Sequence, residues 1–234
     1  MKVLLSILWT ATAAPYSVRR GARVWAALIG LPDPDGKGAA RVNDALRTLT
    51  KEKFLRSDRQ RGKTAELTLL SELGTGADYS HPGEAWAAAK EADPRERRRV
   101  QRYVKLPVTL WTSGWIAELD GAALAMLLIL MSAARGRDPE DLWFTPQVAS
   151  DRYALSETTR ARGIAELKRY GLVAVYRTPV VRDHISSRRF RNTYTLNTHV
   201  FELHPEAALE AAAAKKPETP LSPIAAVERL GLQR

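Results

Sequence analysis

The chain has 234 residues, of which 45% are hydrophobic, and its 36 Lys and Arg outnumber 26 Asp and Glu to give a net charge of +10. This length suffices for one large or two small domains, and the hydrophobic content excludes a chain that is disordered throughout. The excess of positive charge predicts an acidic partner, with nucleic acid first and an anionic membrane surface second.

Cysteine is absent, and the four histidines are scattered without the spacing of metal ligands. The lack of cysteine rules out disulfides and thiolate metal sites and is typical of a reducing cytoplasm. We therefore expect a cytoplasmic, nucleoid-associated protein with no metal site and no cofactor.

The N-terminal segment MKVLLSILWTATAAP imitates a secretory signal, but only Val3–Trp9 is strongly apolar, which is short for such a signal. It is read either as the first helix of a domain or as a signal-like segment. A second apolar run, Ala123–Ala134, is far shorter than the roughly 20 residues that a membrane span needs. This run predicts a buried helix, and no membrane partner is expected.

In the first half of the chain, YSVRRGARVWAALIGLP (16–32) predicts a helix, and a second helix follows within 38–55. Val42, Ala45, Leu46 and Leu49 recur on one face of this second helix, as in an amphipathic helix. A strand, a glycine-containing turn and a second strand follow in 56–70. Residues 74–102, rich in Gly, Pro and charge, predict a linker with a short helix at 84–91.

In the second half, 103–111 predicts a strand and 113–136 one long buried helix. Thr145 and Pro146 are typical of a helix start, and a short helix is expected after them. Ser156 is a good N-cap for the next helix, and Gly171 is suited to end it. Residues 172–181 and 188–197 have the composition of paired strands, with a loop at 182–186. Beyond Pro205 we expect a flexible tail with at most one short helix near its end.

The segment LSETTRARGIAELKRYGLV (155–173) resembles the recognition segment of winged helix-turn-helix proteins, particularly the GntR-like type. One departure is Arg160, which stands where that family usually has an apolar residue, so the helix is rotated or the side chain extends outward. The residues that carry the resemblance are Ser156, Thr158, Thr159, Ile164, Leu167, Gly171, Leu172 and Val173.

The same pattern recurs in the first half when Leu49 is aligned with Leu167, because Phe54 and Leu55 then match Leu172 and Val173. We therefore expect an α+β fold, mainly helical, with two tandem winged helix-turn-helix units. The expected first unit is 1–73, the linker 74–102, the second unit 103–203 and the flexible tail 204–234. Such a tandem arrangement without an effector domain is similar to plasmid replication initiators.

Positive charge is concentrated in the two predicted helix-and-hairpin segments. Nine Lys or Arg face three acids in 37–63, and ten face three acids in 152–191. A solvated helix face is the alternative interpretation of each window, but both coincide with the same motif. Ser156 and Thr159 would bind phosphate or cap the helix, and the hairpin residues would track phosphates or enter a minor groove. The predicted DNA-binding residues are Arg41, Asn43, Arg47, Arg59, Arg61, Lys63, Ser156, Thr158, Thr159, Arg160, Arg162, Arg188, Arg189 and Arg191.

No catalytic signature is found: the segment DPDGKGAA has a Gly-Lys pair but not the spacing of a phosphate-binding loop. The sequence thus predicts a non-enzymatic, sequence-specific binder of double-stranded DNA, either a transcriptional regulator or a replication initiator. Further partners would be a second copy of the chain or replication and transcription proteins. The alternative is a winged-helix scaffold in a larger assembly, which should not carry a basic helix and a basic hairpin together.

Overall fold

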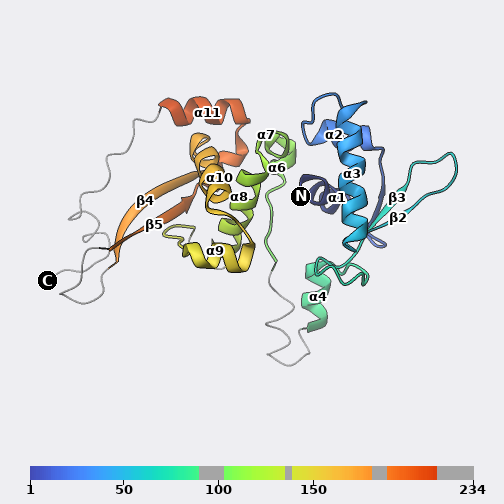
Figure 1. The fold of residues 1–234 in the computed structure, drawn as a ribbon, viewed down its shortest axis with the longest axis horizontal. Coiled ribbons are helices and arrows are strands. Elements are labelled where there is room, and N and C mark those ends of the chain that lie inside the picture. Colours follow the sequence, from blue (N-terminus) through green and yellow to red (C-terminus); the bar gives the residue numbers. More distant parts are fainter. Residues whose placement is uncertain (90–102, 135–138, 181–188, 215–234) are drawn as a thin grey trace. The chain divides into compact units, whose positions relative to one another are not determined.

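The computed structural model describes residues 1–89, 103–134, 139–180 and 189–214. This part of the chain is α+β, about half helical, with small antiparallel sheets. It divides into two compact units (Figure 1). The first contains Met1–Lys105 with Ile116–Glu118, and the second contains Leu106–Trp115 with the described residues from Leu119 onward.

The first unit places a three-stranded antiparallel sheet beside its helices (Figure 1). The strand order is β1-β3-β2, so the first strand pairs with the last. Leu55, Leu67 and Leu69 of the sheet are buried together with Ile7, Trp25 and Val42 of the helices. The elements are α1 (Lys2–Thr10), β1 (Ser17–Arg19), α2 (Ala22–Leu28), α3 (Lys37–Lys51), β2 (Leu55–Asp58), β3 (Glu66–Leu69) and α4 (Pro82–Ala89).

The structure decides between the two readings of the N-terminal run and corrects the helix expected at 16–32. The N-terminal apolar run forms α1, whose Val3 and Ile7 are buried. The segment 16–32 is not a single helix, because Ser17–Arg19 forms β1 and the helix begins only after Gly21, which is extended at φ −68° and ψ 154°. Pairing of Ser17–Arg19 with β3 supplies backbone hydrogen bonds across the sheet, and this tertiary gain outweighs a local helical pattern.

The second unit is built around an almost wholly apolar helix, α8, with Leu124, Leu127 and Leu130 buried. Trp115 contacts Tyr170 and Phe201 edge to face, at centroid distances of 5.4 and 5.7 Å. The elements that follow the linker are α6 (Thr109–Thr112), α7 (Trp115–Glu118), α8 (Gly121–Ala134), α9 (Pro146–Tyr153), α10 (Glu157–Arg169), β4 (Val173–Val180), β5 (Arg189–Leu196), η1 (Thr198–Glu202) and α11 (Pro205–Ala214).

Two expectations for this part of the chain are wrong, and the expected tail contains one additional helix. Residues 103–111 do not form a strand, and their end belongs to the short helix α6. The segment 113–136 is not one helix: Gly114 adopts the left-handed conformation at φ +84°, and Asp120 starts a new helix by accepting a hydrogen bond from the Ala123 amide at 2.7 Å. In the expected flexible tail, 204–234, residues Pro205–Ala214 form α11. Its alanines favour a helix, and Ala208 is buried. Residues 215–234 lie outside the described residues.

The two units share one order of elements and one pairing of strands. In the second unit Leu142 pairs with Tyr194 of β5, with N···O distances of 2.9 and 2.7 Å, and β5 pairs with β4. The order Leu142-β5-β4 therefore matches β1-β3-β2 of the first unit. In both units a helix, α1 or α8, precedes the short strand or bridge, and two helices and a hairpin follow it. The second unit has in addition α6 and α7 before α8, and η1 and α11 after the hairpin.

The helix that precedes the hairpin in each unit, α3 or α10, ends in the same way. After α10, Gly171 is left-handed at φ +70°, and the Leu172 amide donates to the Leu167 carbonyl at 3.0 Å. After α3, Lys53 is left-handed at φ +59°, and the Phe54 amide donates to the Leu49 carbonyl at 2.9 Å. This is the Schellman motif. The sequence pairing of Leu49 with Leu167 thus corresponds to an identical place in the local geometry.

Replacing Gly171 with Val should lower the free energy of unfolding of the second unit by about 1–2 kcal/mol, because a β-branched residue opposes the left-handed conformation. Gly171→Asn is the matched control, since Asn tolerates this conformation and should retain most of the stability. Urea unfolding of the wild type and both variants measures the effect. Equal losses in the two variants would mean that the backbone conformation is not what Gly171 supplies.

Candidate nucleic-acid interface

A groove in the first unit lies between α3, the residues that begin α2 and the hairpin β2–β3. It encloses about 670 Å³, and Leu46 and Leu67 are its larger apolar lining residues. The hairpin supplies residues on both sides of its glycine turn at Gly62, which is left-handed at φ +75°. The polar lining residues are Arg20, Asn43, Arg47, Thr50, Ser57, Arg59, Gln60, Lys63 and Thr64.

Helix geometry explains which α3 residues reach this groove. Asn43 and Arg47 are four residues apart and so occupy the same face, one turn from each other. Val42, about 100° from Asn43 around the helix, is fully buried, which fixes the rotation of the helix. Arg41 is also exposed, but it lies two residues from Asn43, a rotation of about 200°, and is not among the groove-lining residues. Arg61 likewise lies beyond the groove, at the turn of the hairpin.

The lining residues include four positive side chains, Arg20, Arg47, Arg59 and Lys63, and no Asp or Glu. Arg47 forms an ion pair with Asp44 on the same helix, and the two side chains are 75% and 63% exposed. An ion pair this exposed contributes at most about 1 kcal/mol, so it can be exchanged for another acceptor. The groove therefore combines concentrated positive charge with two amide side chains, Asn43 and Gln60.

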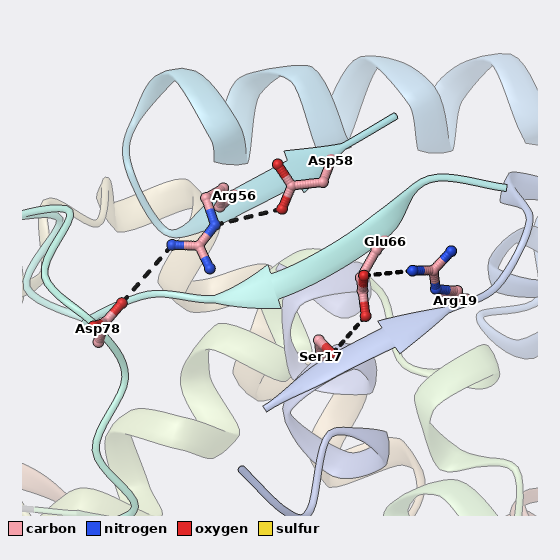
Figure 2. A network of polar contacts seen from close by, with 6 residues as sticks. All are labelled: Ser17, Arg19, Arg56, Asp58, Glu66 and Asp78. Atoms are coloured by element: carbon pink, nitrogen blue, oxygen red, sulfur yellow. Dashed lines mark hydrogen bonds and ion pairs between the residues drawn. The ribbon is translucent and has the colours of Figure 1, made fainter. Parts of the chain in front are cut away.

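The acidic residue of β3 lies on the other face of the sheet. Glu66 accepts hydrogen bonds from the Ser17 hydroxyl at 2.9 Å and from the Arg19 guanidinium at 2.6 Å (Figure 2). The hydrogen bond from Ser17, assisted by the charge of Arg19, holds the pKa of Glu66 below its usual value. Glu66 is thus ionised near neutral pH and compensates Arg19 on that face.

The same face carries a second set of compensated charges. Arg56 lies 3.5 Å from Asp58 and 3.8 Å from Asp78 (Figure 2). Asp58 is opposite Glu66 in the strand register, so both point away from the face that presents Leu67 to the groove. The alternation of side chains along the strands therefore separates the acids of the sheet from the positive groove.

The loop before α3 already satisfies the amides at the start of that helix. The Asp33 carboxylate accepts hydrogen bonds from the Gly36 amide at 3.2 Å and the Lys37 amide at 2.8 Å. Helix N-termini that bind phosphate use such amides for the ligand. At the start of α3 the amides of Gly36 and Lys37 therefore already have an acceptor within the protein.

In the second unit, Ser156 caps α10, which is one of the two roles expected for Ser156 and Thr159, and Thr159 supplies the amide that is capped. The Ser156 hydroxyl accepts from the Thr159 amide at 3.2 Å and lies 2.9 Å from the Thr159 hydroxyl. Thr145 caps α9 similarly, accepting from the Val148 amide at 3.1 Å. Thr158, the remaining predicted residue of this first turn, is exposed.

Arg160 and Arg162, the two predicted DNA-binding arginines of α10, both form ion pairs within the unit. Arg160 is only 17% exposed and lies 3.9 Å from Glu157. Burial raises the pKa of Tyr194, and the nearby charge of Arg160 opposes that rise. Arg160 lies seven residues before Leu167, as the buried Val42 lies seven before Leu49, so the departure from the family pattern places this arginine on the packed side.

Arg162 links α10 to the beginning of α8. Its Nε lies 3.1 Å from Oδ2 of Asp120, the residue that caps α8. The Asp120 amide in turn donates to the Glu166 carboxylate at 2.8 Å, and partial burial raises the pKa of Glu166. Arg162 keeps most of its surface exposed, but its guanidinium is oriented by this contact.

The hairpin β4–β5 carries two arginines stacked on aromatic rings. Arg191 lies 4.4 Å from the centroid of Trp143, and Arg177 lies 5.3 Å from that of Phe190. The strand register places these two arginines on opposite faces of the hairpin. Arg188 lies outside the described residues, and Arg189 is placed only as the first residue of β5. Arg177 and Trp143 are not among the predicted DNA-binding residues.

Comparison with known protein families, with curated proteins and with solved structures finds no match for this chain. None of the helices in the described ranges is long and apolar enough to cross a lipid bilayer. Among the same residues, no group of three or more His, Asp or Glu is arranged to hold a metal ion.

Proposed function

We propose that this protein binds double-stranded DNA in a sequence-specific manner with two winged helix-turn-helix units. In this proposal α3 and α10 each enter a major groove, and the hairpins β2–β3 and β4–β5 contact the neighbouring backbone. The shared order of helices and strands supports two units of one kind. The observation that carries the proposal is the groove beside α3, with four positive side chains, Asn43 and no acid in its lining.

The geometry of this groove suits a duplex. The major groove of B-DNA is about 12 Å wide and admits one α-helix, whose polar side chains then face the base edges. In this proposal Asn43 and Arg47 are the side chains of α3 that face the base edges. Arg59 and Lys63 of the hairpin contact the phosphate backbone beside them. A winged-helix scaffold that binds only proteins would have no need for an acid-free positive groove.

The biological role within this proposal is transcriptional regulation or initiation of replication. Two units in one chain could bind adjacent half-sites without a second subunit. Footprinting on genomic DNA distinguishes the two roles: a site within a promoter favours regulation, and iterated sites near an origin favour initiation. A partner protein of either machinery is compatible with both.

The proposal predicts strong salt dependence of duplex binding. Two basic surfaces contacting about 6–10 phosphates should give a log–log slope of about −5 to −9, with affinity falling about 10³- to 10⁵-fold between 50 and 200 mM salt. Fluorescence anisotropy with a labelled duplex at several salt concentrations measures the slope. No duplex binding at low salt, or a slope near zero, would exclude this function and leave the scaffold alternative.

A further inference from the structure

The two units present different chemistry at equivalent positions. We infer that sequence discrimination resides in the first unit, where Asn43 and Arg47 read an adenine and a guanine, and that the second unit holds DNA with little base preference. This inference rests on the proposed function, because it assigns separate roles to the two DNA-binding units.

The equivalence follows from the shared helix ends. Leu49 and Leu167 both accept the hydrogen bond that closes the Schellman motif, so each residue of α3 from Ala39 onward has a defined counterpart in α10. Asn43 lies six residues before Leu49, and its counterpart is Ala161. Arg47 lies two residues before Leu49, and its counterpart is Ala165.

The first unit can make two specific base contacts from these positions. Asn forms paired hydrogen bonds with adenine N6 and N7, and Arg does so with guanine O6 and N7. Four residues of helix rise about 6 Å, and base pairs are stacked about 3.4 Å apart, so the two bases should lie one or two steps apart. Arg20, Arg59 and Lys63 around the same groove supply positive charge for the adjoining phosphates.

The second unit lacks side chains that can do the same from this face. Ala161 and Ala165 are exposed but can only make apolar contacts. Arg160 is largely buried, and Arg162, which pairs with Asp120 at 3.1 Å, lies five residues before Leu167 and so takes the place of Asp44, not that of Asn43 or Arg47.

The exposed charges that remain on α10 are suited to the backbone. Lys168 and Arg169 lie in its last turn and are exposed, and Arg169 stacks on Tyr170 at 5.2 Å. Both lie beyond Ala165, the counterpart of Arg47, and base contacts in helix-turn-helix proteins come from residues nearer the start of the recognition helix, so these two charges favour phosphate contacts. The second unit would therefore add affinity without adding much sequence information.

Selection of bound duplexes from a random pool tests the inference with the full chain. We expect one informative half-site that contains an adenine and a guanine one or two steps apart. Asn43→Ala and Arg47→Ala should each lower the affinity ratio between the selected site and a scrambled duplex by about 5- to 150-fold. Lys168→Ala is the matched control and should weaken binding to both duplexes by similar factors.

A modified duplex tests the guanine contact without relying on a protein variant. Replacing the selected guanine with 7-deazaguanine removes the N7 acceptor, which should weaken binding of the wild type and have little further effect on Arg47→Ala. Two half-sites of equal information, or an unchanged affinity ratio in both α3 variants, would overturn the inference while leaving duplex binding intact. A wild type that binds no duplex would instead refute the proposed function itself.

Discussion

Replacing Gly163 with Ala is expected to lower the free energy of unfolding of the second unit by about 1–3 kcal/mol, the range for overpacking a tight interior. A Cβ at this position would lie 2.4 Å from the carbonyl oxygen of Ala122 and 2.8 Å from Cγ of Met126. The Ala122 oxygen belongs to the backbone of α8, so α8 and α10, which carries Gly163, would have to move apart. In an uncrowded helix the same change would stabilise by about 0.5–1 kcal/mol, so the expected sign comes from packing.

Gly121→Ala is the matched control, because Gly121 is also helical and a Cβ there would meet nothing within 4 Å. It should leave the stability unchanged or slightly raised. Urea or thermal unfolding, followed by a fluorescent label on a cysteine introduced into the second unit of this chain, which has no cysteine of its own, compares the two variants. If Gly163→Ala were as stable as Gly121→Ala, the close crossing of α8 and α10 would be wrong.

Elements with local signals could be predicted from the sequence. The start of α9 follows from Thr145 with Pro146, and the limits of α10 follow from Ser156 and Gly171, because caps depend on neighbouring residues alone. The hairpins were predictable for the same reason, since each has β-forming residues on both sides of a turn or loop.

Elements that depend on distant partners could not be predicted in this way. The strand β1 has only the residues Ser17–Arg19, and it exists through pairing with β3, nearly 50 residues later in the chain. The importance of Gly163 has the same origin, because only the approach of α8 makes a methyl group unacceptable there. A periodic pattern also cannot reveal that Gly114 and Asp120 divide an apolar segment into separate helices.

The candidate site was predictable in its charge but only partly in its members. A single sequence does not fix the rotation of a helix, so it could not separate Asn43 and Arg47 from Arg41 on α3. Arg20 joins the groove because the β1–β3 pairing brings the start of α2 beside the hairpin. Burial of Arg160 depends on the packing of α10 near Tyr194, which no local pattern encodes.

Removing two charges from the groove should weaken duplex binding far more than removing two charges from the opposite face of the same sheet. The double variant Arg59→Gln/Lys63→Gln should reduce the magnitude of the salt slope by about 2, because each lost phosphate contact removes about 0.9. Relative to the affinity at 1 M salt, each phosphate contact raises the affinity at 0.1 M salt by a factor of about 8. Losing two contacts should therefore weaken duplex binding at 0.1 M salt by about 60-fold.

Arg19→Gln/Arg56→Gln is the matched control, since it lowers the net charge by the same amount. Both arginines are about half exposed, yet they already compensate Glu66, Asp58 and Asp78 on the outer face of the sheet. Their removal should leave the salt slope unchanged and alter affinity by no more than about 3-fold, because charges facing away from the duplex are largely screened beyond about 10 Å at 0.1 M salt. If both double variants lowered the slope equally, DNA would be responding to net charge alone, and the groove beside α3 would not be the binding surface.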